Sequence, residues 1–160
     1  MNWLRAHFEK HRRRAPWDFC WRVAVEGVLV SIATVAILYP VIGAPEREFL
    51  KWPAASVIII VLLLAPVFET LLFQAIPIAL ARRLQAGFRV QVLFSVIPFT
   101  LAHLPEGLAV GIGAGFLGGF YLAFTYAHWV EKSVWTALWT TMAAHAIRNT
   151  LPTAVAILFF

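Results

Sequence analysis

Long apolar runs separated by short polar connections make up most of the chain. The runs predict membrane helices at residues 22–42, 53–80, 90–102, 108–128 and 133–149, with a short apolar segment after Pro152. A helix that crosses about 30 Å of hydrocarbon needs about 20 residues, so the run at 90–102 is short for a full crossing. The segment after Pro152 either continues the fifth helix past a kink or packs as a half-helix. The pattern therefore predicts an all-α, polytopic transmembrane helical bundle of about five to six membrane helices.

The polar segments are too short for a second folded unit, so one domain is expected. We divide the chain into a basic, Trp-rich interfacial tail (1–21) and a single transmembrane domain (22–160), whose motif-bearing core is 66–149. Trp3, Trp17 and Trp21 suit the headgroup region. The run after the tail is too long for a signal peptide and has no small-residue cleavage pattern, so we expect a retained helix. Cys20 is the single cysteine, which excludes an internal disulfide and a multi-cysteine zinc site.

Composition and charge support a membrane protein. Hydrophobic residues make up 61% and charged residues 13% of the 160 residues, whereas soluble domains have about 45–50% and about 25%. The net charge of +5 is concentrated in the tail, in the loop around residues 82–89 and at Lys132. The positive-inside rule places these segments, and the N-terminus, on the cytoplasmic side. We expect a multi-pass protein of a prokaryotic cytoplasmic (inner) membrane. No aromatic and basic surface of useful size remains, so nucleic acid is not an expected partner.

Three polar clusters interrupt the apolar runs. They are Glu69-Thr70-Leu71-Leu72-Phe73-Gln74, Phe99-Thr100-Leu101-Ala102-His103 and His145-Ala146-Ile147-Arg148-Asn149. Carboxylate, imidazole and amide groups are costly in hydrocarbon, and those that occur there usually have a function. The clusters are therefore the candidate site.

Each cluster suggests a chemical role. His145 and Asn149 are four residues apart, hence on one helix face, and two neutral donors there suit a developing oxyanion. Phe99 has the same spacing to His103 and can pack on its imidazole. Glu69 lies in an apolar span, and a carboxylate in such a dry site is a plausible general base near neutral pH. His103 could share a water molecule with it.

Three further patterns concern the surroundings of the site. Thr70 and Gln74 are four residues apart and are expected to hydrogen-bond along the helix, and Pro66 predicts a kink beside Glu69. Glycines at 107, 111, 115 and 119 form one stripe that lets a helix approach closely, either within the chain or between subunits. We expect Glu26 to form a local ion pair with Arg22.

The three clusters together resemble the CAAX protease and bacteriocin-processing (Abi) family, which includes the Ras-converting CAAX endopeptidases. That family carries EExxxR, then FxxxH, then HxxxN or HxxxD on membrane helices. The second and third motifs match fully. In the first, Thr70 and Gln74 replace the second glutamate and the arginine, so both members of a charged pair are lost together.

The resemblance implies a glutamate-type intramembrane endopeptidase acting on a membrane-associated protein or peptide. By analogy, Glu69 and His103 activate a water molecule, while His145 and Asn149 stabilise the oxyanion. Neither a metal nor a cofactor is implied.

Three other hypotheses remain open from the sequence. The incomplete first motif suits a non-catalytic membrane scaffold or bacteriocin-immunity protein of the same fold. Glu69, His103 and His145 could be zinc ligands of a metal-dependent hydrolase. Glu69 could also be the relay of a proton-coupled transporter, which at this size would need oligomerisation.

Overall fold

The computed structural model describes residues 9, 14–43 and 52–159, with side chains through residue 155. The predictions for Trp3, for residues 10–13 of the basic tail and for the 44–51 connection therefore lie outside the described residues. Every helix or turn in the described part is consistent with the all-α prediction, and that part contains no strand.

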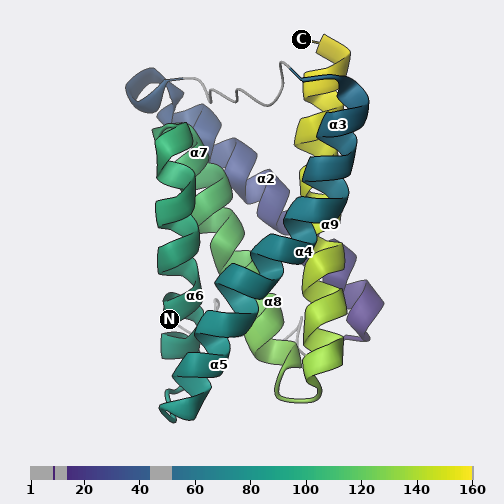
Figure 1. The fold of residues 1–160 in the computed structure, drawn as a ribbon. Coiled ribbons are helices and arrows are strands. Elements are labelled where there is room, and N and C mark those ends of the chain that lie inside the picture. Colours follow the sequence, from purple (N-terminus) through teal and green to yellow (C-terminus); the bar gives the residue numbers. More distant parts are fainter. Residues whose placement is uncertain (1–8, 10–13, 44–51, 160) are drawn as a thin grey trace.

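The described elements follow the predicted order closely. The bundle is built from α2 (Pro16–Ile42), one long composite helix, α6, a second composite helix and α9 (Val134–Phe159) (Figure 1). The first composite comprises α3 (Ala54–Ile59), η2 (Ile60–Leu64), α4 (Ala65–Glu69), η3 (Thr70–Ala75) and α5 (Ile76–Arg83). After α6 (Phe88–His103) and η4 (Leu104–Glu106), the second comprises α7 (Leu108–Val110), η5 (Gly111–Gly118) and α8 (Gly119–Trp129).

Four of the described helices are long and apolar enough to cross a membrane: Pro16–Ile42, Ala54–Arg83, Phe88–Glu106 and Leu108–Trp129. The protein is thus a helical membrane bundle. The third span is longer than the 90–102 run predicts, because η4 continues α6 to Glu106. α9 is a fifth long helix that packs against α2 and α8, and it runs through Pro152 without ending there.

The first helix begins six residues earlier than predicted. Pro16 occupies the first turn, where its missing N–H costs nothing. Asp18 accepts hydrogen bonds from the Arg14 and Arg22 guanidinium groups, which hold this first turn together. Phe19 and Cys20 are fully buried. The last part of the predicted tail is therefore a packed part of the membrane helix.

Arg22 and Glu26 have other partners than the sequence suggests. Arg22 Nε lies 2.7 Å from Asp18 Oδ1. Glu26 instead accepts a hydrogen bond of 2.9 Å from Tyr121 Oη on α8. Arg22 thus pairs with the carboxylate one turn before it instead of the one a turn after it, and the contact of Glu26 across 95 residues is not visible in a local i, i+4 pattern.

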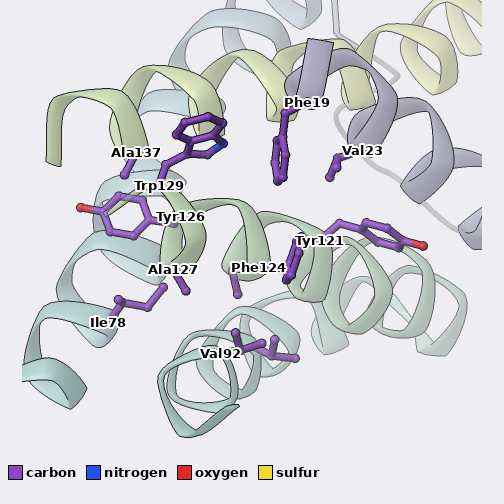
Figure 2. Packing of buried hydrophobic residues seen from close by; sticks show 12 residues of the cluster. Phe19, Val23, Ile78, Val92, Tyr121, Phe124, Tyr126, Ala127, Trp129 and Ala137 are labelled. Carbon is purple, nitrogen blue, oxygen red and sulfur yellow. The ribbon is translucent and has the colours of Figure 1, made fainter. Parts of the chain in front are cut away.

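An aromatic cluster closes one end of the bundle, where the first turns of α2 and α9 meet α5, α6 and the last turns of α8 (Figure 2). The Phe19 ring packs edge-on against Trp129, with centroids 5.6 Å apart, and stacks on His128 at 5.3 Å. Ile78, Val92 and Ala137 join the cluster from α5, α6 and α9. This packing fixes which ends of the helices lie together.

Prolines account for the π-helical turns of the first composite helix. In η2 the Ala65 N–H donates to Ile60 O, five residues back. The next residue, Pro66, has no N–H, so the corresponding acceptor, Val61 O, lacks a helical donor. Asn149 Nδ2 on α9 donates to that oxygen at 3.0 Å. The proline thereby creates an anchoring point for another helix.

A second backbone oxygen of the same composite helix also contacts a neighbouring helix. Ser95 Oγ on α6 donates a hydrogen bond of 2.7 Å to Phe73 O in η3. Two neighbouring helices are thus joined to backbone oxygens of the helix that carries Glu69.

The glycine stripe packs against α6 within the chain. A Cβ at Gly115 would lie 3.0 Å from Thr100 Cα and 3.1 Å from His103 Cβ, and one at Gly119 would lie 2.8 Å from Phe99 Cδ1. Gly107 does not take part in this packing, because nothing lies within 4 Å of its Cβ position. It precedes the second composite helix and has a φ of +103°. The predicted close approach is confirmed for the three helical glycines, and it brings the second polar cluster into the bundle.

Candidate active site

The bundle brings one side chain from each polar cluster to a common point. Glu69 Oε2, at the end of α4, lies 3.6 Å from His145 Nε2 on α9 and 4.0 Å from His103 Nε2 at the end of α6. Both distances exceed the 2.7–3.2 Å of a direct hydrogen bond. They leave room for one small group that contacts the carboxylate and both imidazoles.

These side chains line a cavity of about 210 Å³. Asn149, Phe99 and Arg148 also line it, as do apolar residues of the first composite helix and Leu122 of α8. Glu69 keeps 27% of its side-chain surface accessible, whereas His145 keeps 5%. The carboxylate is therefore reachable from the cavity, while His145 forms part of its wall.

His103 is oriented by a backbone hydrogen bond. Its Nδ1 lies 2.8 Å from Phe99 O, one helical turn earlier. A carbonyl oxygen can only accept, so we assign the proton of this contact to Nδ1. In the neutral ring, Nε2 then carries the lone pair and faces Glu69, which suits it to accept a proton.

His145 has the opposite arrangement. Its Nδ1 is buried and has no hydrogen-bond partner among the described residues, whereas Nε2 faces Glu69. A buried N–H without an acceptor is rarer in proteins than an unpaired acceptor, so we assign the proton to Nε2. The two imidazoles then present an acceptor and a donor to the same point.

The ring of Phe99 contacts both imidazoles. Its ring is buried, with its centroid 4.4 Å from that of His103 and 6.1 Å, edge-on, from that of His145. Phe73 packs edge-on against Phe99, with ring centroids 5.4 Å apart. Phe99 thus forms an aromatic contact for both imidazoles.

Asn149 lies at the cavity wall, one turn after His145. Its amide is held in place by the hydrogen bond to Val61 O. A primary amide carries two N–H donors, so one of them is not used by this bond. The sequence spacing placed Asn149 on the face of His145 but gave no sign of the distant backbone partner.

The predicted hydrogen bond between Thr70 and Gln74 is absent. Both side chains are fully buried, and neither Thr70 Oγ1 nor the Gln74 amide has a hydrogen-bond partner among the described residues. Both residues belong to the π-helical η3. A shared helix face allows such a hydrogen bond, but it does not orient the two side chains toward each other.

Sequence reasoning missed Arg148 as a residue of the cavity wall. Its Nη2 donates to Ser31 Oγ at 2.8 Å and to Gly113 O at 2.7 Å, and the side chain is buried. A Cβ at Gly118 would lie 2.8 Å from its Nε, and one at Gly27 would lie 2.9 Å from its Nη1. The available signal was an arginine within an apolar span, together with glycines outside the regular stripe.

A second, larger cavity of about 560 Å³ adjoins the first. It lies between α2, η5 and α9 and has a mainly apolar lining that includes Val35 and Tyr39. Arg148 and Asn149 belong to the walls of both cavities. The polar site therefore borders an apolar chamber.

Within the described residues, no group of three or more His, Cys, Asp and Glu side chains is placed to hold a metal ion. The donor set that the metal hypothesis names is Glu69, His103 and His145.

Comparison with known proteins identifies the chain at the level of family. Residues 51–151 match the family model described as type II CAAX prenyl endopeptidase Rce1-like, which covers more than half of the chain. No curated protein and no solved structure gives a significant match. The matched region contains all three polar clusters. The chain belongs to the Rce1-like type II CAAX prenyl endopeptidase family, a family of membrane proteases.

Proposed function

We propose that the protein is an intramembrane endopeptidase that hydrolyses a peptide bond of a membrane-associated protein or peptide. The observation that carries this proposal is the convergence of Glu69, His103 and His145, with imidazole-to-carboxylate distances of 3.6 and 4.0 Å, in one cavity. Membership of a protease family supports the reaction class.

Glu69 and His103 are proposed to activate the attacking water. A water between them can direct its two protons to the Glu69 carboxylate and to His103 Nε2. As its oxygen bonds to the carbonyl carbon of the substrate, one proton passes to Glu69, and the water becomes the hydroxyl group of a tetrahedral intermediate. A positioned general base contributes about 10²–10⁴-fold to such a step.

His145 and Asn149 are proposed to stabilise the oxyanion of that intermediate. His145 supplies the Nε2–H, and Asn149 supplies the N–H not engaged with Val61 O. One such donor is worth about 10²–10³-fold in rate. When the C–N bond breaks, the proton held by Glu69 is transferred to the departing amine, which regenerates the carboxylate and balances the reaction.

The adjoining apolar cavity gives room for an apolar part of the substrate. Asn149 and Arg148 form the wall that this cavity shares with the Glu69 cavity, so a substrate segment bound there would lie next to the proposed oxyanion donors. Such binding would hold the scissile bond close to Glu69, and positioning of this kind supplies a large part of catalysis.

The proposal is tested by cleavage of a verified substrate with His103→Ala and His145→Ala in proteoliposomes. We expect both variants to insert and fold like the wild type and to lose cleavage by at least about 10²-fold. A chelator arm on the wild type measures metal dependence. Retained cleavage in both variants would overturn the proposal, and loss of wild-type activity on chelation would favour the metal-dependent hydrolase.

A further inference from the structure

The cavity around Glu69 has a defined entrance and a closed floor. Trp52, just before α3, and Glu106, at the end of η4, line it at one end of the bundle. Trp52 is 50% exposed, so the cavity reaches the surface there. At the other end the lining residues Phe99 and Leu122 are buried in an apolar cluster with Cys20, Ala24 and Ala144. The exposed end of this cavity is therefore the end with Trp52 and Glu106, while Asn149 and Arg148 form the wall that it shares with the larger cavity.

Positive charge collects at the opposite end of the bundle. Phe19 packs against Trp129, so the start of α2 lies beside the turn between α8 and α9, and Ile78 and Val92 join the same cluster from α5 and α6 (Figures 1 and 2). The described cations of these segments, here called the basic end, are Arg14, Arg22, Arg82, Arg83, Arg89 and Lys132. Only Asp18 and Glu131 oppose them in these segments.

The end with the entrance carries little charge. Among its described residues, the helix ends at 42–43, 52–58, 103–108 and 150–159 contain one charged residue, Glu106. In the sequence, the 44–51 connection adds two cations, Arg47 and Lys51, to this end, against the six of the basic end. The bias in Lys and Arg between the two ends of short connections is what sets the orientation of a membrane protein.

We infer that the cavity opens on the non-cytoplasmic face of the membrane. The basic end is then cytoplasmic, and Glu69 is reached from the side on which α3 begins and α9 ends. What this orientation means for the substrate rests on the proposed function. The substrates are membrane-associated proteins or peptides whose scissile bond reaches the non-cytoplasmic surface, and bonds confined to the cytoplasm are not reached.

The orientation can be tested without a substrate, by labelling single cysteines with a membrane-impermeant maleimide in intact and permeabilised bacterial spheroplasts. Glu106→Cys places a thiol at the entrance. Gly87→Cys is the matched control at the basic end, where the residue is exposed and a Cβ meets nothing within 4 Å. The wild type is the blank, because its single cysteine, Cys20, is fully buried.

We expect Glu106→Cys to react in intact spheroplasts and Gly87→Cys only after permeabilisation, with at least a tenfold difference in labelling between the two conditions for Gly87→Cys. The reverse pattern, or equal labelling of Gly87→Cys in both conditions, would overturn the inference. Ala114→Cys, in the wall of both cavities, should react with a small impermeant thiosulfonate from outside. Reaction of this variant from the cytoplasmic side alone, or from neither side, would contradict an entrance on the outer face.

Fusions to the wild-type sequence provide a second measurement of orientation, which does not depend on the cysteine variants inserting correctly. Figure 1 shows the end of α9 on the same side as the start of α3, so a C-terminal alkaline phosphatase fusion should be active and a C-terminal green fluorescent protein fusion dark. The opposite result would overturn the inference. Because neither readout uses proteolysis, failure here is distinct from failure of the cleavage test.

Discussion

Gly115→Ala tests whether the close contact between η5 and α6 positions the site. A Cβ at this position would lie 3.0 Å from Thr100 Cα and 3.1 Å from His103 Cβ, whereas ordinary contacts begin at 3.4 Å. Backbone atoms cannot rotate away, so α6 must retreat by about 0.4 Å and carry His103 with it. A misplacement of 1 Å costs about 10²-fold in rate, so we expect a five- to tenfold loss, roughly scaled from that figure.

Stability should change much less than activity in this variant. Overpacking costs about 1–3 kcal/mol, and replacing a helical glycine by alanine returns about 1 kcal/mol. The expected net loss is therefore about 0–2 kcal/mol, measured by thermal unfolding in detergent. Activity is measured as the initial rate of cleavage of a verified substrate, normalised to folded protein.

Gly111→Ala is the matched control on the same glycine stripe. Its Cβ would meet Leu104 Cδ2 at 2.5 Å, but this is the tip of a side chain that is 38% exposed and can rotate away. The nearest backbone atom, Leu104 Cα, lies at 3.4 Å, an ordinary contact distance. We expect a change in rate of no more than about twofold. Equal losses in the two variants, or a larger loss for Gly111→Ala, would refute the argument.

Three further substitutions test individual contacts. Asn149→Ala leaves Val61 O without its donor, so it should lower stability by about 1–3 kcal/mol in thermal unfolding. It should also lower the cleavage rate by at least about tenfold, and an unchanged rate would exclude an oxyanion role for Asn149. Ser31→Ala should cost about 1–2 kcal/mol by removing an acceptor of the buried Arg148 guanidinium, and no change would mean that this hydrogen bond contributes nothing. Gln74→Leu should keep or raise the unfolding temperature, because the buried amide has no hydrogen-bond partner among the described residues; a fall of several degrees would show that the amide has a partner in the membrane.

The sequence predicts the course of the helices well, because apolar length is a strong signal in membrane proteins. The predicted runs and the observed spans agree to within a few residues at most ends, such as 108–128 against Leu108–Trp129. The main difference is the start of α2 at Pro16. There the polar side chains of Arg14, Asp18 and Arg22 look like a tail in a hydropathy pattern but pair along one helix face.

The side-chain partners could not be predicted in the same way. Local spacing predicts which side chains share a helix face but not whether they bond to each other, so it fails at Thr70 and Gln74. It also carries no information on contacts between distant segments. The hydrogen bond from Asn149 to Val61 O and the buried position of Arg148 between η5 and α2 arise only from tertiary packing.

The cleavage rate of Glu69→Gln tests the central claim most directly, because this change keeps the size of the side chain and removes its ability to take a proton. Glu131→Gln, the same change in the turn between α8 and α9, is the control. With a verified substrate and equal amounts of folded protein, we expect Glu69→Gln to be slower than the wild type by about 10²–10⁴-fold. The Glu131→Gln variant should stay within about twofold of the wild type, as expected for a residue remote from the site. A Glu69→Gln rate within about tenfold of the wild type would contradict a water-activating role for this carboxylate.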